Sequence, residues 1–162
     1  MLRTAQLVAG LSLALTCGAA NAQLAAHKDL TLPVAVAMAQ TAVQTCNAQG
    51  YKVSAHVVGR NAEVIVAMRG DGTGPHTLEN SMKKAYTARM QRRPSGEFAQ
   101  AAKDNPTIGA LHLANMIPAQ GALPIKVGDD VIGAIGISGA PGGDKDEACA
   151  KAGIDKVADQ LK

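Results

Sequence analysis

The order of its helical and extended patterns predicts that the chain folds into an α/β domain of the α+β type. Two pairs of β-branched segments, 51–58 with 63–69 and 123–127 with 131–138, are each joined by a short connection, which is typical of β-hairpins. Helical periodicity precedes, separates and follows these pairs. We therefore expect one antiparallel sheet with helices on both faces, in an α/β/α layering.

Residues 1–22 are predicted to be a cleavable signal peptide, followed by a single mature domain at 23–162. The charge of Arg3 precedes a short apolar run at 7–16, and the small residues at 20–22 precede the expected cut. The alternative is a short buried helix. A signal peptide predicts a periplasmic or secreted protein with no membrane insertion after signal cleavage.

Composition excludes several classes of partner. The formal net charge is only +3, which is too mild to predict binding to nucleic acid. Tryptophan is absent and there are only two tyrosines and one phenylalanine, so the aromatic platforms of RNA-binding modules are not expected. The small basic cluster of Arg89, Arg92 and Arg93 is interpreted as a solvated helix end, where cations suit the helix dipole.

The first helix is predicted to begin after Thr31, a suitable N-cap, with Pro33 in its first turn, and to stop at Gly50. Its apolar positions recur at helical spacing and include Met38 and Cys46. Cys46 therefore points at the body of the domain.

The middle of the chain predicts further helices after the first hairpin. The glycine-rich segment 70–75 breaks the strand pattern, and a helix is expected from there to about Arg92, ending before Pro94. A shorter helix at 95–103 is expected to be capped by Ser95. Residues 108–116 could form a helical turn or two.

In the last third, the strand at 131–138 is almost entirely apolar or glycine. This predicts a central strand that is buried on both faces. Asp144 and Glu147 have the spacing of a capping box for the last helix, which carries Cys149 close to its apolar face.

Cys46 and Cys149 are the two cysteines of the predicted mature chain. Two thiols in an oxidising compartment usually pair, and they can meet if the first and last helices cover the same face of the sheet. A disulfide is therefore predicted, with two separate buried thiols as the alternative.

His76 is the candidate metal ligand. It lies at the start of a predicted helix beside the glycine-rich segment. The positive end of a helix dipole keeps an imidazole neutral, the form that binds metals and serves as an axial ligand of haem iron. The alternative is a plain exposed histidine. The glycine-rich segment itself could bind an anion or be only a flexible turn.

The other histidines and the possible nucleophiles predict no catalytic or zinc site. His56 is expected to be a satisfied, half-buried strand residue, and His112 could line an apolar pocket or lie at the surface. No two histidines have close metal-ligand spacing. Ser81 and Ser138 lack the motifs of hydrolytic serines. We therefore expect a non-catalytic protein.

Three stretches together carry a family resemblance: RGDGTGPHT at 69–77, KAYTA at 84–88 with RPS at 93–95, and the segment 121–143. Through them the chain resembles the GlcG/HbpS-like haem-binding family over about residues 30–162. That family is related to the C-terminal domain of some corrinoid adenosyltransferases.

The resemblance implies a profilin-like fold and a homo-oligomer, commonly an octamer, that binds haem or responds to iron. It makes His76 the candidate iron contact, with Thr77, Lys84 and Tyr86 near a haem cofactor. The expected function is that of an exported haem-binding or haem-handling protein. The alternative is a sensory or accessory module that binds an organic acid or a corrinoid without haem.

Overall fold

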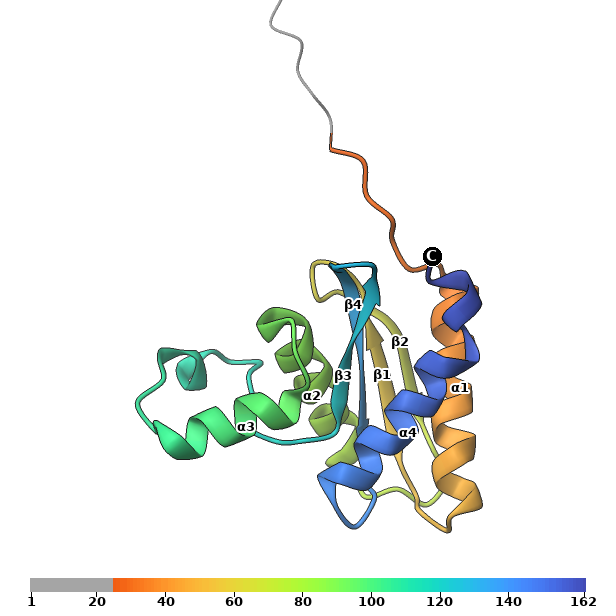
Figure 1. Cartoon of the computed structure of the whole chain (residues 1–162). Coiled ribbons are helices and arrows are strands. Elements are labelled where there is room, and N and C mark those ends of the chain that lie inside the picture. The colour runs from red at the N-terminus through yellow and green to blue at the C-terminus, as the bar shows by residue number, and fades with distance from the viewer. Residues whose placement is uncertain (1–24) are drawn as a thin grey trace, which may run out of the picture.

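A computed structural model describes residues 25–162, so the signal peptide predicted at 1–22 lies outside the described residues. These described residues form four α-helices and four strands, with two short 3₁₀ turns (Figure 1). In chain order they are α1 (Leu32–Ala48), β1 (Ser54–Val58), β2 (Val64–Arg69), α2 (Thr77–Gln91), α3 (Ser95–Asp104), η1 (Gly109–His112), β3 (Ala122–Val127), β4 (Asp130–Ser138), α4 (Gly143–Lys156) and η2 (Ala158–Gln160).

The four strands form one antiparallel sheet in the order β2-β1-β4-β3. The two hairpins are joined through β1 and β4, in a register that places His56 opposite Gly136. Every residue of β1 is buried, and so is every residue of β4 after Asp130. The structure thus confirms both the predicted fold class and the central position of the strand at 131–138.

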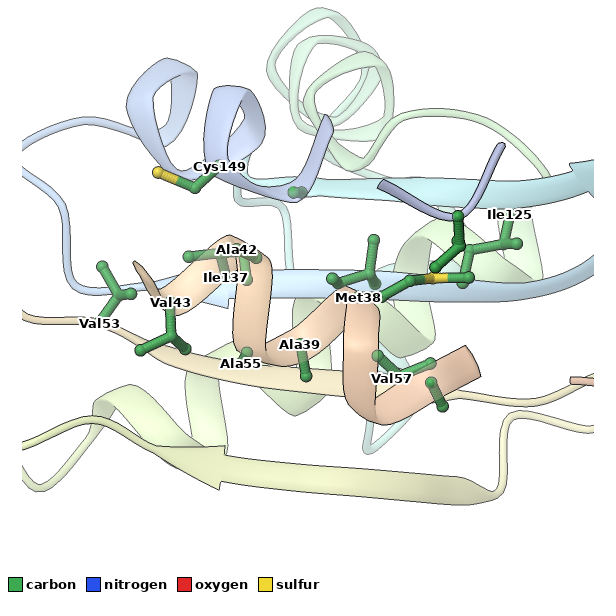
Figure 2. Close-up of a cluster of buried hydrophobic side chains, with 14 of the residues drawn as sticks. Met38, Ala39, Ala42, Val43, Val53, Ala55, Val57, Ile125, Ile137 and Cys149 are labelled. Atoms are coloured by element: carbon green, nitrogen blue, oxygen red, sulfur yellow. The ribbon is translucent and has the colours of Figure 1, made fainter. Parts of the chain in front are cut away.

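Helices α1 and α4 cover one face of the sheet, and α2 covers the other with α3 beside it (Figure 1). The main apolar core lies under α1 and α4, where Met38, Val57 and Ile137 are fully buried (Figure 2). Cys46 of α1 and Cys149 of α4 are joined there by a disulfide, with their Cα atoms 5.7 Å apart. The predicted pairing is therefore present, because the first and last helices do share a face.

The opposite face brings α2 very close to the sheet through small residues. Ala85 and Ala88 of α2 pack on Ala122 and Ala134 of the sheet. A Cβ atom added at Gly136 would collide with backbone atoms of α2 at Ser81 and Ala85. This close approach explains why a central strand carries glycine at that position.

Three details of helix capping differ from the sequence predictions. Pro94 occupies the cap position of α3, and the Ser95 hydroxyl instead accepts the Ala122 N–H at 3.0 Å. Gly142 precedes α4, and the Glu147 carboxylate accepts a hydrogen bond from Gln120 at 3.1 Å rather than closing a capping box. Thr31 precedes α1 without a side-chain cap bond. The side chains of Ser95 and Glu147 therefore make tertiary hydrogen bonds instead of capping their own helices.

Within residues 25–162, no helix has both the length and the apolar composition that crossing a bilayer requires.

Candidate functional site

The side of α2 that faces the sheet carries buried polar residues beside its alanines. Thr77, Ser81, Lys84 and Thr87 are each at most 4% exposed. A buried polar group is costly unless it has a hydrogen-bond partner, and each of these four has one. Together they form a polar seam between α2 and the sheet that ends at His76.

The first turn of α2 is held by hydroxyl groups. The Thr77 hydroxyl donates to the Gly74 carbonyl at 2.9 Å, and its oxygen lies 2.8 Å from the Ser54 oxygen of β1. The Arg69 guanidinium donates to the Thr73 hydroxyl and carbonyl at 3.2 and 3.1 Å. These bonds secure both ends of the glycine-rich segment, and so they position the histidine that follows it.

His76 directly precedes α2 and is exposed. Its ring folds over Gly74, where an added Cβ atom would lie 3.1 Å from Nδ1 but 3.9 Å from Nε2. Nε2 is therefore the ring nitrogen farther from the loop. Gly74 leaves room for the ring, which a larger residue would displace.

Two hollows meet at His76 and Asn80. The polar hollow, of about 370 Å³, is bounded by α2, the end of β4 and the start of α4. Its lining is His76, Asn80, Lys84, Ala119, Gln120, Ser138, Gly139, Ala140, Gly142, Gly143 and Asp146. The side hollow, of about 270 Å³, is lined by His76, Glu79, Asn80, Lys83 and Ile117. The exposed imidazole is thus shared by both spaces.

A buried ion pair lies in the wall of the polar hollow. The Lys84 ammonium is 2.7 Å from Asp146 Oδ2 and donates to the Ile137 carbonyl at 3.1 Å. Asp146 Oδ1 accepts the Ala140 N–H at 3.0 Å. Burial raises the pKa of the Asp146 carboxyl, and the neighbouring Lys84 charge opposes that rise. The pair ties α2 to the first turn of α4, and Asp146 also holds the preceding loop through the Ala140 N–H.

Gly121 makes room for this ion pair. Its φ is +130°, a backbone conformation that side-chain-bearing residues rarely adopt, and an added Cβ atom would lie 2.8 Å from Lys84 Nζ. A larger residue here would therefore displace the ammonium.

His56 is a structural histidine. It is 5% exposed, and its Nδ1 lies 2.9 Å from the Ser81 oxygen. Because the Ser81 hydroxyl donates its single proton to the Leu78 carbonyl at 2.9 Å, Nδ1–H is the donor to Ser81. Burial lowers the pKa of His56, which favours the neutral ring. The satisfied histidine expected from sequence is present, and it is more deeply buried than expected.

The structure brings together two of the four residues proposed for the site. His76 and Lys84 line the polar hollow, whereas Thr77 and Tyr86 line neither hollow. Thr77 is buried against Ser54, and Tyr86 is half-buried on α2. His112 lies exposed at the end of η1.

Sequence reasoning missed Asn80, Ser138 and Asp146. Asn80 donates to the Ser138 oxygen at 3.0 Å across the polar hollow. The spacing of His76, Asn80 and Lys84, one helical turn apart each, was an available signal that these side chains share one side of α2. Nothing local in the sequence pointed to Asp146.

A hollow larger than these two lies elsewhere, between β3 and α4. It holds about 650 Å³ and is lined by Pro94, Gln120, Leu123, Pro124, Lys126, Asp144, Glu147, Ala148, Lys151, Ile154 and Asp155. That lining contains no histidine, cysteine, methionine or tyrosine, the side chains that ordinarily ligate haem iron. The imidazole between the two smaller hollows is the better candidate.

The single imidazole of His76 suits an iron ion that a porphyrin already holds. Among residues 25–162, no three histidine, cysteine or acidic side chains gather in a way that could hold a metal ion. An iron in a porphyrin already has four nitrogen ligands and needs only an axial donor from the protein. A single exposed imidazole meets that requirement, so the residues present fit haem better than a free metal ion.

Comparison with known proteins matches residues 30–155 to a family described as haem degrading protein HbpS-like. The crystal structure of HbpS is 34% identical and covers 82% of this chain and 93% of its own, with a TM-score of 0.78. A double mutant of HbpS from Streptomyces reticuli is 31% identical, covers 94% and 97% of the two chains, and has a TM-score of 0.78. The PduOC:heme complex, 19% identical over 78% and 94% of the two chains with a TM-score of 0.72, shares the fold.

Proposed function

The chain belongs to the HbpS-like family, and from that premise we propose that it is an exported, non-catalytic protein that binds haem through His76. The observation that carries the proposal is an exposed imidazole at the meeting of two hollows. Hydrogen bonds of Thr77 and Arg69 to the preceding loop hold that imidazole in place.

Each part of a haem finds a chemical counterpart among the residues around His76. The His76 imidazole is the axial donor, and haem itself supplies an iron with a coordination position open to that donor. In the side hollow, Ile117 offers apolar surface and Lys83 offers an ammonium for a propionate. Lys83 already contacts the exposed carboxylate of Glu79 at 2.7 Å, and an ion pair near the surface is weak enough to exchange partners.

Titration of the purified protein with haemin tests this proposal. The wild-type protein is expected to shift the Soret band, and His76→Ala is expected to weaken binding by roughly tenfold or more, because the axial bond is lost. His112→Ala, which removes another exposed imidazole, is the matched control and should bind like the wild type. An unchanged titration of His76→Ala would exclude His76 as the ligand, and no shift in the wild type would exclude haem.

Export is supported by the disulfide, since such bonds persist mainly in oxidising compartments. Expression of the full-length chain with fractionation is expected to recover a protein that begins at Gln23 outside the cytoplasm. A cytoplasmic protein that retains residues 1–22 would contradict the proposal.

A second candidate function is binding of a small organic acid or a corrinoid without haem. The polar hollow favours an organic acid, because Asn80, Ser138 and Lys84 converge there with few apolar neighbours. Thermal-shift measurements with small carboxylic acids, corrinoids and haemin separate these candidates. An organic acid in the polar hollow should raise the melting temperature of the wild type and not of Asn80→Ala, while Lys83→Ala, which alters only the side hollow, retains its response.

A further inference from the structure

Three arginines gather at the C-terminal end of α2, in the segment that the sequence predicts to be a solvated helix end. Arg89 lies in the last turn of α2, Arg92 follows the helix directly, and Arg93 comes next. The structure shows less solvation than expected, because Arg89 and Arg93 are only partly exposed. The Nε atoms of both are buried, and within residues 25–162 neither has a hydrogen-bond partner.

The Arg89 Nε–H is therefore a buried donor that the fold itself does not use. A buried N–H without an acceptor destabilises a protein, more so when the group is charged. Such donors are rare in native structures, and an ion or a water ordinarily bonds them. An acceptor from outside the chain would satisfy this one.

The charges around Arg89 are on balance positive. Burial lowers the pKa of Arg89, and so do the neighbouring charges of Arg60 and Arg92, whereas Asp130 and Glu63 act in the opposite direction and less strongly. Like charges held close together repel one another, and an anion between them removes that repulsion.

The two carboxylates that act on Arg89 already have other partners. Both carboxylate oxygens of Asp130 accept hydrogen bonds from Arg60, at 3.1 and 2.8 Å. The Glu63 carboxylate accepts a backbone N–H of its own turn at 2.8 Å. In the described part of the chain, no salt bridge includes Arg89 or Arg92. Arg60 is thus neutralised within the fold, and the other two guanidinium groups are not.

Arg92 occupies a backbone conformation in which glycine is usual. Its φ is +56° and its ψ is +27°, in the left-handed region, at the position that ends α2. Glycine or asparagine ordinarily ends a helix in this conformation, because a Cβ atom is disfavoured there. An arginine at this position strains the helix end, which is consistent with a role for its exposed side chain.

We propose that this end of α2 is a binding site for a phosphate-type oxyanion, held between the guanidinium groups of Arg89 and Arg92. A guanidinium presents a planar fork of N–H donors that bonds two oxygens of one anion. A phosphate group has enough oxygens for two such forks. The site lies at the opposite end of α2 from His76, about 20 Å along the helix axis, so it does not rest on haem binding.

NMR of the arginine Nε–H groups tests the site directly with inorganic phosphate. Phosphate is expected to shift the Arg89 Nε–H resonance of the wild-type protein and to raise the melting temperature. Chloride at the same ionic strength should do neither to the same extent, because screening alone forms no hydrogen bond. A response to phosphate no greater than the response to chloride would overturn the proposal.

Two variants remove the guanidinium groups while favouring the fold. Arg89→Met keeps a long apolar side chain and removes the unpartnered donor, and Arg92→Gly supplies the residue that the left-handed conformation prefers. In urea denaturation without phosphate, both should be at least as stable as the wild type. Both should nevertheless bind phosphate roughly tenfold or more weakly.

Lys103→Gln is the matched control, because it removes an exposed positive charge from the last turn of α3. This variant should bind phosphate like the wild type. Folded Arg89→Met and Arg92→Gly proteins that bind phosphate like the wild type would overturn the proposal. So would an equal loss in Lys103→Gln, which would show an effect of net charge alone.

Two further probes identify the source of the phosphate group. Binding of glycerol phosphate that Arg89→Met loses would indicate a small phosphorylated molecule. Retention on phosphatidylglycerol vesicles but not on phosphatidylcholine vesicles, again lost in Arg89→Met, would indicate a lipid headgroup. Haemin titration of Arg89→Met and Arg92→Gly should match that of the wild type, so this measurement reports separately on the proposed function.

Discussion

At the scale of single residues, His56 and His76 differ in their surroundings and therefore in their chemistry. His76 is exposed at the start of a helix, whereas His56 is buried and donates to Ser81. Burial alone removes His56 from ligand chemistry, because its ring nitrogen is committed to the interior and its protonation is penalised. Of these two chemically identical side chains, only His76 remains available to a ligand.

His56 makes stability depend on pH. Its pKa in the folded state lies below the ordinary value of 6.5, so the unfolded state binds more protons as pH falls through that range. The stabilising contribution of the neutral ring is fully present above the ordinary value and is lost as the pH falls towards the folded pKa. Urea unfolding at about pH 7 and about pH 5 should show a smaller loss for His56→Gln than for the wild type. An identical loss in both proteins would contradict this prediction.

At the scale of elements, α2 and α4 meet through charge rather than through apolar packing. Lys84 and Asp146 are 4% and 2% exposed, and their contact anchors the loop that closes the polar hollow. A buried pair of this kind contributes little net stability when intact but costs much when one partner is lost. Its retention in this wall is consistent with a role in shaping the hollow.

A double-mutant cycle on the ion pair tests this interpretation. Asp146→Asn and Lys84→Met should each lower the free energy of unfolding by about 3–5 kcal/mol, because each leaves one buried charge unpaired. The double variant should lose clearly less than the sum. Lys151→Met, which breaks the exposed Lys151–Asp155 pair, is the control and should cost far less. Additive losses in urea denaturation would show that the two charges are not coupled.

At the scale of the whole molecule, the two faces of the sheet have different compositions. The α1 and α4 face holds the main apolar core and the disulfide, while the α2 face combines a small alanine-rich cluster with buried polar side chains and leads to the candidate site. The apolar core and the disulfide thereby lie on the face of the sheet opposite α2, the helix that His76 precedes. The α2 face can then be shaped by hydrogen bonds, which are directional and position side chains.

The disulfide closes a loop that spans most of the domain, with 103 residues of sequence separation. In the chain-entropy model, a disulfide that closes a loop of about a hundred residues raises the free energy of unfolding by roughly 4–5 kcal/mol. Replacing Cys46 and Cys149 together by alanine should therefore lower the free energy of unfolding by an amount of that order. The denatured, unreduced mature protein should show no free thiol. Two titratable thiols would contradict the pairing.

The sequence by itself determined the order of the helices and strands, the buried central strand at 131–138 and the inward face of α1 that carries Cys46. These follow from local periodicity, since each pattern repeats within a few neighbouring residues. The family resemblance likewise rested on short local motifs. The predicted caps at Ser95 and Glu147 were wrong. A side chain at a capping position can instead form a hydrogen bond with a residue that is distant in the sequence, and local patterns do not predict such a bond.

Only the tertiary structure decided which distant side chains meet. Asn80 reaches Ser138 across 58 positions, and Lys84 reaches Asp146 across 62. Such contacts depend on how the helices lie on a twisted sheet, and no local pattern records that geometry. The polar hollow beside His76 therefore became visible only once α2, β4 and α4 were packed together, because its walls come from segments that are far apart in the chain.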